Sequence, residues 1–315
     1  MKTILIILAL ALIWIGCNTG PVTAPEVEPP ALEKAIHDEQ GLVELEYCDL
    51  PNTDYDPIEA DTFYQPIDAD SIEMYVFQDK PYYHPVYLCH RINWFLGAYY
   101  HTGATKYLER AEKSTQKLIS RSHMINNAAY LPYDYDYAVH YDPANMRTAP
   151  WYSGMAQGEF LGVLCRMYEL TGKEEYKDFS HLVFRSIARL RPNSDIWVSR
   201  IDSLGYFWIE AFPHDEHPCM TLNCFMAAVV GLYDYVTMTN SRQGKRIWDA
   251  CLTTLKHYLP EFRRPGRTSY YCLGHKVVAW PRYHDFHCRL LNTLSEMSGD
   301  PYFAEMSDLF ESDTR

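Results

Sequence analysis

The sequence is poor in motifs that bind phosphates, nucleic acids or metals. Its 315 residues contain no Gly-rich phosphate loop, no extended stripe of Lys and Arg, and no CxxC pair. The first two absences argue against nucleotide and nucleic-acid binding. Two segments rich in histidine, 214–217 and 282–287, lack the fixed helical spacing of a known metal motif. We therefore expect neither a metal ion nor a cofactor.

Basic residues are nearly absent from one N-terminal stretch. From Glu26 to Glu73 there are 15 acidic residues and one basic residue, Lys34, whereas residues 74–315 hold 26 acidic and 26 basic residues. The net charge of −13 therefore belongs to an acidic arm, and the body is neutral. A polyanionic ligand would be repelled by the arm but not by the body.

A hydrophobic run of transmembrane length is missing from the N-terminus, where a shorter run occurs. Lys2 precedes the apolar residues Ile4 to Ile15, and Gly16 and Cys17 follow. The pattern predicts a signal peptide over 1–17 and resembles a bacterial lipoprotein signal. We expect export and attachment to a membrane, in the periplasm or at the cell surface, through a lipidated Cys17. An ordinary signal peptide with secretion and an uncleaved anchor are the alternatives.

The rest of the chain divides by composition into three parts. Residues 18–35 are polar and Pro-rich, as in a linker, and 36–75 are the acidic arm, expected to cover the surface as loops and short turns. Residues 76–315 are predicted to fold as one domain. Eight cysteines follow Cys17, mostly within apolar helical runs, so buried thiols are expected rather than disulfides.

Aromatic residues are abundant, with 26 Tyr and 7 Trp. A ring face stacks on the C–H face of a pyranose while a hydroxyl forms hydrogen bonds, so this composition fits a sugar-binding cleft. A Tyr-rich core explains it equally well.

One pattern occurs four times in the body: an apolar periodic segment ends at a turn, and a more polar helix follows. Gly103, Gly172 and Gly299 mark three turns, and Asn240 marks a fourth without glycine. The first two glycines are 69 residues apart, and Gly172 and Gly299 are 127 apart, or two steps of about 64. Helical hairpins at this period predict an all-α fold, an (α/α) toroid with the first helix of each pair on the inner wall.

Three long connections join these repeats, at 126–151, 195–217 and 263–284. Each alternates β-branched or aromatic residues with others, which predicts a small β-hairpin. Loops on a rigid frame often carry function, so we expect the site at the rim that they form.

Three blocks of the body resemble the D-glucuronyl C-5 epimerases that act on heparan-type polysaccharides. Residues 151–158 (WYSGMAQG) resemble the family's WYSAMGQG. Residues 208–213 (WIEAFP), then 222–226 (LNCFM) and 231–234 (GLYD), resemble WYEEYP, LNGFM and GLYD. Residues 269–275 (SYYCLGH), with Arg282 and 285–287 (DFH), resemble TIYDLRH and RWDYH. The resemblance is good over 150–312 and weak over 76–150.

This resemblance implies a uronosyl 5-epimerase acting on an acidic polysaccharide. A base removes the proton at carbon 5 of a glucuronic acid, and an acid on the other face returns it. The resemblance leaves open whether this protein forms a homodimer, as relatives do. The matched motifs assign catalysis to Tyr271 and Glu210, and substrate binding to Trp151, Tyr152, Gln157, Trp208, His275 and Arg282. We expect one common cleft to be faced by Trp151, Tyr152, Glu210, Tyr271, His275, Arg282 and His287.

Several acid and base positions of the family are not kept. The second Glu of WYEEYP is Ala211 and its Tyr is Phe212, the Tyr of RWDYH is Phe286, and the Arg of YDLRH is Gly274. Because Phe and Ala cannot transfer a proton, a second acid/base group must come from elsewhere. The nearest in sequence are His284 and His287, with 214–217 as another source. Arg282 is expected to hold the substrate carboxylate and to lower the pKa of Tyr271.

Three functions therefore remain open from the sequence. The matched blocks favour the epimerase. A uronate polysaccharide lyase would begin with the same proton abstraction. The lost acid and base residues favour a catalytically inactive polysaccharide-binding lipoprotein.

Overall fold

The computed structural model describes residues 32–51, 53, 56–191 and 193–314. The predicted signal segment, including Cys17, and most of the predicted linker lie outside these residues. Within the described part, no helix combines the length and the apolar character needed to cross a bilayer.

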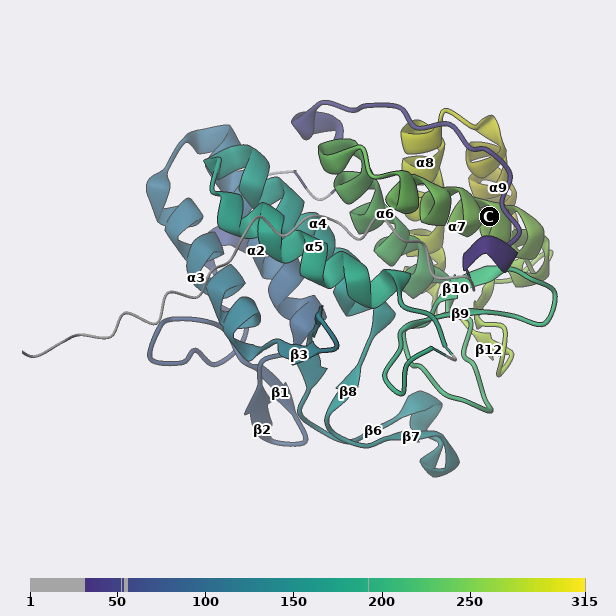
Figure 1. The fold of residues 1–315 in the computed structure, drawn as a ribbon, viewed down its shortest axis with the longest axis horizontal. Helices are drawn as coiled ribbons and strands as arrows, with labels where there is room; N and C mark the ends of the chain where they lie inside the picture. The colour runs from purple at the N-terminus through teal and green to yellow at the C-terminus, as the bar shows by residue number, and fades with distance from the viewer. Residues whose placement is uncertain (1–31, 52, 54–55, 192, 315) are drawn as a thin grey trace, which may run out of the picture.

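Four helical hairpins form the body, as predicted, and the fold is an all-α, toroid-type array (Figure 1). Hairpin partners lie antiparallel, and successive hairpins stand side by side along a curve. The pairs are α2 (Pro85–Thr102) with α3 (Thr105–Arg121), α4 (Gly154–Thr171) with α5 (Glu174–Ala188), α6 (Leu222–Thr239) with α7 (Arg242–Phe262), and α8 (Pro281–Ser298) with α9 (Pro301–Ser312).

The first helix of each pair ends in the same way. Gly103, Gly172 and Gly299 follow α2, α4 and α8 with φ of 66°, 66° and 67°, and Asn240 follows α6 with φ of 53°. Each residue adopts the left-handed conformation that glycine, and next best asparagine, tolerates. The backbone N–H of each then bonds to a carbonyl four residues earlier. The hairpin that lacks the glycine, α6 with α7, therefore ends its first helix with the same left-handed C-cap, formed by asparagine.

The inner wall consists of α2, α4, α6 and α8, as expected from their apolar character. Each has 18 residues, and the sixth residue is His90, Glu159, Ala227 and Phe286 in turn. These four equivalent residues line one cavity of about 160 Å³ between the inner helices. The repeat in the sequence thus places equivalent positions around one centre.

Two inner helices approach so closely that only glycine fits between them. A Cβ on Gly231 of α6 would lie 1.8 Å from the carbonyl oxygen of Gly158 on α4, and one on Gly158 would lie 2.3 Å from Cα of Ala228. Beside this contact, Arg166 of α4 donates to Asp234 of α6 at 3.0 Å, with both side chains buried. The centre of the array is therefore fixed by close backbone packing and one buried ion pair.

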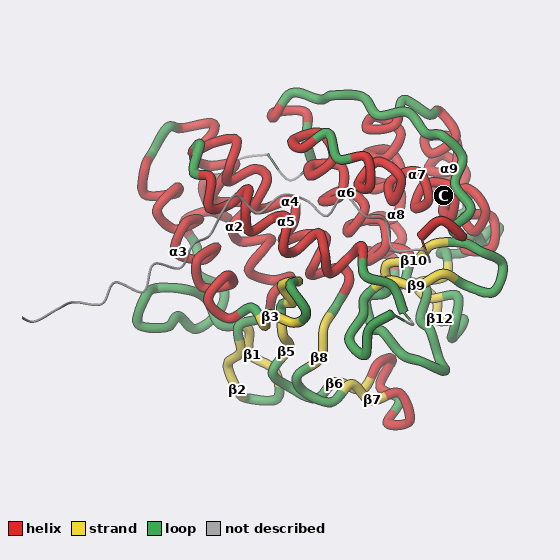
Figure 2. Tube along the Cα trace, in the orientation of Figure 1, coloured by secondary structure: helices red, strands yellow, loops and turns green. Residues whose placement is uncertain are grey.

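Short strand pairs extend from one rim of the helices (Figure 2). The three predicted hairpins are present, although the first begins at His123, before the predicted connection. All pairs are antiparallel. They are β1 (Tyr75–Phe77) with β2 (Lys80–Tyr82), β3 (His123–Ile125) with β4 (Ala128–Tyr130), β5 (Pro132–Tyr133) with β8 (Trp151–Tyr152), β6 (Tyr137–Ala138) with β7 (Met146–Arg147), β9 (Ser199–Ile201) with β10 (Phe207–Ile209), and β11 (Tyr270–Cys272) with β12 (Val277–Val278).

The first part of the acidic arm crosses the ends of the helices opposite the strand pairs, and its last part returns along α2 and α3 to β1 (Figure 1). Its elements are short: η1 (Leu32–Lys34), η2 (Tyr47–Asp49) and α1 (Pro57–Asp61). The backbone N–H of Val43 bonds to Met297 O at 2.8 Å, and that of Leu45 bonds to the Tyr233 hydroxyl at 3.0 Å. Arg91 of α2 forms a buried ion pair with Glu73. Part of the arm's negative charge is therefore neutralised by the body.

Candidate functional site

A cleft of about 340 Å³ opens at the rim that carries the strand pairs. Its walls come from β1, from α2, α4, α6 and α8, and from all three connections, and its lining is mostly aromatic. Among the described residues, the lining includes no Lys, Arg, Asp or Glu. The principal lining residues are Tyr75, Phe77, His84, His90, Tyr133, Tyr135, Tyr137, Trp151, Phe212, Asn223, Cys224, Tyr271, Tyr283 and Phe286.

Trp151 is the centre of the aromatic wall. Its ring stacks on Tyr133 with centroids 4.1 Å apart and on Tyr137 at 6.0 Å, and Tyr137 stacks in turn on Phe212 at 5.6 Å. The indole Nε1–H donates to Tyr135 O at 2.9 Å, which fixes the orientation of the ring. Rings held in this way offer apolar faces with polar edges, the combination that packs against a sugar ring.

Tyr271, on β11, also lines the cleft, as the matched motif predicted. Its hydroxyl lies 3.9 Å from Cys224 Sγ, and its ring meets that of Tyr283 edge to face at 5.2 Å. The expectation that Arg282 lowers the pKa of Tyr271 is wrong. Arg282 is exposed and stacks on Trp280 and Tyr283, while burial raises the pKa of Tyr271 well above its usual value.

The other phenols of the wall behave in the same way. Burial raises the pKa of Tyr137 to about 12 and raises the pKa values of Tyr133 and Tyr135 further. These hydroxyls stay protonated near neutral pH, so the wall offers neutral hydrogen-bond donors. His84 is also neutral there, because burial lowers its pKa to about 4, and its Nδ1 caps α2 by accepting from Tyr87 N–H at 3.1 Å.

His90 is the basic group of the cleft, and sequence reasoning missed it. Its side chain is 46% exposed, and Nε2 lies 3.1 Å from Glu159 Oε1. The negative charge of Glu159 raises the pKa of His90. The signal was present in the repeat: His90 and Glu159 are 69 residues apart, as are Gly103 and Gly172. Equivalent inner-helix positions therefore meet as a histidine–carboxylate pair.

Glu210 and Trp208, which the motif placed in the cleft, lie in the interior instead. Both carboxylate oxygens of Glu210 are used structurally, one accepting from Arg200 Nε at 2.8 Å and the other from Met220 N at 3.1 Å. Trp208 is buried, with Nε1 donating to Asp202 at 3.0 Å. Neither side chain lines the cleft, because β10 is buried along its whole length beneath the rim.

Gln157 is also structural. Its amide accepts from Leu131 N at 2.8 Å and donates to Ala129 O at 2.7 Å and Ser186 Oγ at 2.6 Å. This fully buried side chain ties α4 and α5 to the segment that follows β4. Gln157 therefore does not line the cleft in which the matched motif placed it.

His284 and His287 are buried inside the fourth repeat, away from the cleft. His284 accepts from Ser269 N at 3.0 Å through Nδ1, and its Nε2 lies 2.9 Å from Phe310 O. His287 pairs through Nδ1 with Ser269 Oγ at 2.8 Å, and burial lowers its pKa to about 3. Their predicted catalytic placement is wrong, because α8 turns them toward α9 and leaves Phe286 on the cleft side.

Tyr152 and Trp151 point to opposite sides of β8, since neighbouring strand residues alternate. The Tyr152 hydroxyl bonds to His123 Nδ1 at 2.8 Å, and the side chain lines a separate hollow with Trp197 and His214. His214 caps its own turn by accepting from the N–H groups of Glu216 and His217 at 3.1 and 3.0 Å. The alternative source of catalytic groups at 214–217 is therefore not in the cleft.

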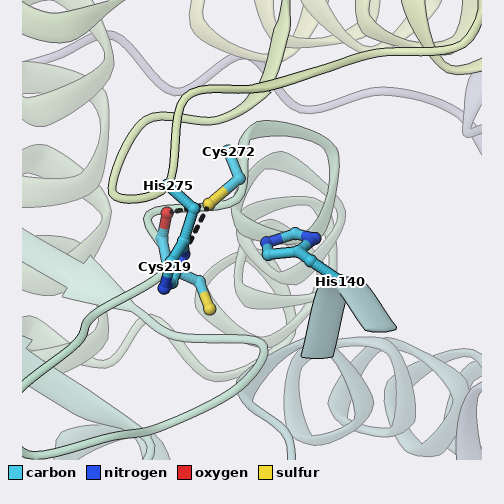
Figure 3. Close-up of side chains that lie close together, drawn as sticks. All are labelled: His140, Cys219, Cys272 and His275. Atoms are coloured by element: carbon cyan, nitrogen blue, oxygen red, sulfur yellow. Dashed lines mark hydrogen bonds between the residues drawn. The ribbon is translucent and has the colours of Figure 1, made fainter. Parts of the chain in front are cut away.

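His275 lies behind Tyr271, in a group with His140, Cys219 and Cys272 (Figure 3). Its Nε2 is 3.1 Å from Asn145 Nδ2, and its Nδ1 is 3.3 Å from Cys272 Sγ. It therefore borders the wall that carries Tyr271 and does not line the cleft itself.

Three of the four positions that depart from the family motifs line the cleft, and the fourth, Gly274, does not. Ala211, Phe212 and Phe286 all belong to its wall. The cleft therefore coincides with the predicted location, although most of the residues expected to act there do not face it.

Residues 126–312 match the family model described as the D-glucuronyl C5-epimerase C-terminus. Among curated proteins, an uncharacterized protein of Methanocaldococcus jannaschii is 23% identical over 207 residues, covering 64% of this chain and 65% of that protein. A D-glucuronyl C5-epimerase of Caenorhabditis elegans is 24% identical over 177 residues, covering 50% of this chain and 28% of that protein. The chain thus spans less than two thirds of either relative.

A solved structure supports the fold assignment. The cellobiose 2-epimerase of Bacillus thermoamylovorans aligns over 90% of this chain and 68% of its own, with a TM-score of 0.53 and 13% identity. At that identity, the similarity concerns the fold alone.

Proposed function

Because this chain belongs to the family of the D-glucuronyl C5-epimerase C-terminus, we propose that it is a sugar epimerase that acts on a uronic-acid polysaccharide. One observation carries the proposal. Tyr271, from a matched motif, and His90, held by Glu159, line the same aromatic cleft although one comes from the third connection and the other from the first inner helix. Proton exchange at carbon 5 needs two such groups near one sugar.

The two groups suit different halves of the reaction. His90 has a charged partner that favours its protonated form, so it is suited to take the proton from carbon 5 and hold it as imidazolium. Tyr271 is protonated at rest, because burial raises its pKa, and is suited to return a proton. His90 loses its proton to solvent afterwards, and Tyr271 regains one, so the cycle balances.

The aromatic wall supplies the binding part of the proposal. Trp151 offers an immobilised ring face for the pyranose. The protonated phenols around it can donate hydrogen bonds to the substrate carboxylate as negative charge develops on it. Arg282 is exposed and stacks on Tyr283 of the cleft wall, so its guanidinium is available to pair with the carboxylate of a neighbouring sugar.

Deuterium uptake tests this proposal directly. The protein is incubated in heavy water with heparosan, as an unsulfated glucuronic-acid polymer, and deuterium at carbon 5 is measured by NMR. Epimerase activity gives exchange without chain cleavage. Unsaturated ends that absorb in the ultraviolet would identify a lyase, and polymer binding without either change would identify an inactive binding protein. Either of those two results contradicts the proposal.

A matched pair of tyrosine variants tests the assignment of Tyr271. Tyr271→Phe keeps the ring and removes the hydroxyl, so exchange should fall about 10²–10⁴-fold while polymer affinity stays nearly unchanged. Tyr152→Phe removes a hydroxyl that bonds to His123 on the other side of β8 and should change exchange by only a few-fold. Equal effects in the two variants would exclude Tyr271 as the acid.

A further inference from the structure

The strongest unassigned feature is a group of two cysteines and two histidines behind the cleft wall (Figure 3). One ligand atom from each of His140, Cys219, Cys272 and His275 lies within 4.8 Å of all the others. We propose that these four residues form a tetrahedral site for a zinc-class divalent cation. The proposal is independent of the proposed epimerase activity.

The donor set and its spacing fit such an ion. Two thiolates and two imidazoles are a standard ligand set for structural zinc, with bonds of about 2.3 Å to sulfur and about 2.0 Å to nitrogen. Tetrahedral geometry then places donor atoms about 3.3–3.8 Å apart. Cys272 Sγ and His275 Nδ1 are already 3.3 Å apart. The remaining atoms need to move inward by about 1 Å or less, a shift within the reach of side-chain rotation.

His140 is held toward the group by an unusual backbone. His140 and Tyr141, in the turn η3 (Val139–Tyr141), have φ of 58° and 61°, in the left-handed region. Such a conformation is strained for a residue other than glycine. The Nε2 atom of His140 is buried without a hydrogen-bond partner. A bound cation would compensate for both features, because it would accept the free lone pair of the imidazole.

Asn145, in the turn η4 (Pro143–Asn145), is placed to hold the His275 ring through the nitrogen that would not bind the cation. Its amide lies 3.1 Å from His275 Nε2, and its Oδ1 is buried without a partner. The two ends of an amide are distinguished only by their hydrogen bonds. With the amide turned, Oδ1 accepts a hydrogen bond from the N–H at His275 Nε2, which leaves the Nδ1 lone pair free beside Cys272 Sγ. A metal-bound histidine almost always donates its other N–H in this way.

The backbone brings the two cysteines together. Gly274 N and Leu273 N donate to the carbonyls of Cys219 and Met220 at 3.0 and 3.2 Å. A Cβ on Gly274 would lie 1.9 Å from Pro218 O, so no other residue allows this approach. The turn after β11 is therefore pressed against the segment before α6, and Cys219 and Cys272 face each other across the contact.

The site would stabilise the wall of the cleft. Its ligands come from the first connection (His140), the segment before α6 (Cys219), and β11 with the turn that follows it (Cys272 and His275), so one ion would join three separate segments. Cys272 directly follows Tyr271, and the His140 and Tyr271 rings lie 6.0 Å apart. With four protein ligands, no position is left for substrate, so the role is structural. Binding releases two thiol protons to solvent, and the cation with two thiolates is neutral.

Metal content and thiol protection test the site in the intact chain. Purified protein should contain about one zinc per chain, and Co²⁺ added to chelator-treated protein should give the absorption of a tetrahedral ion with thiolate ligands. Zinc should protect Cys219 and Cys272 from alkylation and leave Cys48, which is exposed, equally reactive. The double variant C219S/C272S should lose the stoichiometric metal, whereas Cys251→Ala, at a buried cysteine outside the group, should retain it.

Asn145→Ala gives a graded second measurement that does not remove a ligand. It should weaken zinc binding about 10–100-fold, the usual effect of losing a second-shell partner. Circular dichroism shows whether each variant is folded. A Cys219–Cys272 disulfide in the native protein would overturn the proposal. Failure of folded wild-type protein, with both thiols reduced, to bind Zn²⁺ or Co²⁺ would overturn it equally.

Discussion

The helical frame repeats one sequence pattern four times, whereas the rim connections share no repeat. In the frame, four helices of 18 residues repeat the same length, and three of the four end at the same type of residue. The rim has no repeat: Tyr271, Trp151 and the Cys/His group come from segments of different length and conformation. The frame therefore supplies regular positions, and the irregular rim supplies most of the chemistry.

The exception is the sixth position of the inner helices, where the frame itself contributes to the cleft. The first two repeats place His90 and Glu159 there, and the last two place Ala227 and Phe286. Equivalent backbone positions therefore carry a histidine–carboxylate pair in the first two repeats and apolar side chains in the last two. The difference shows that repeat geometry fixes where a side chain points and leaves its chemistry free.

The largest expected effect on the rate of exchange comes from replacing His90 in the His90–Glu159 pair. His90→Gln keeps a hydrogen-bonding group near Glu159 but cannot take a proton at neutral pH, so deuterium exchange should fall about 10²–10⁴-fold. Ala227→Ser, at the equivalent position of the third repeat, should stay within a few-fold of wild type. A decrease of only a few-fold in His90→Gln would show that His90 is not the base.

The role of Glu159 is visible in the pH dependence of the same reaction. Because Glu159 raises the pKa of His90, Glu159→Gln should move the acid limb of the rate profile to lower pH. The sign follows from His90 acting as a base, which must be deprotonated before the reaction begins. An acid limb that does not move would show that the group titrating in the profile is not His90.

Within the frame, the buried ion pair should have the largest effect on stability. Arg166→Met leaves Asp234 buried without its partner and also removes a bond to Pro51 O in the arm. The free energy of unfolding should fall by about 3–5 kcal/mol. Lys106→Met, which removes an exposed pair with Asp61, should change the unfolding free energy far less, because solvent screens that pair. Urea denaturation of both variants measures the contrast, and similar losses would contradict it.

Close packing of the frame gives the next effect. Gly231→Ala forces a Cβ into the Gly158 carbonyl, so the unfolding free energy should fall by about 3 kcal/mol. Gly103→Ala meets no atom within 4 Å and keeps only the cost of its left-handed φ, about 1–2 kcal/mol. If both variants lose the same amount, conformation alone sets the cost and the helix contact is looser than described.

The last comparison separates two histidines by the sign of their effect on the pH dependence of stability. His287 has a pKa of about 3 in the folded protein, below its unfolded value of about 6.5. The unfolded chain therefore binds the extra proton first, and stability falls as pH drops below about 6.5, by at most about 1.4 kcal/mol per unit. His287→Gln should flatten this part of the stability curve.

His90 should act in the opposite direction, because its folded pKa is raised. Its stabilising contribution is present at low pH and is lost as pH rises through that pKa. Unfolding free energies of His90→Gln and His287→Gln across pH 4–8 should therefore differ from wild type with opposite slopes. Equal slopes would mean that one of the two environments is wrongly assigned.

The sequence by itself determined the frame. Turn residues at regular spacing and apolar periodicity are local signals, so four helical hairpins, their inner and outer faces and the small rim hairpins all followed from them. The matched blocks also predicted the cleft wall, since Trp151 and Tyr271 line it.

Only the tertiary structure decided which polar residues face that cleft. Four residues looked reactive in sequence, yet each is hydrogen-bonded to a buried partner in the interior: Glu210, Gln157, His284 and His287. Conversely, Asn145 joins a group whose cysteines are 53 residues apart, and His90 meets Glu159 across two repeats. The reason is physical: periodicity sets the side of an element on which a residue lies, whereas its partners depend on where distant elements cross.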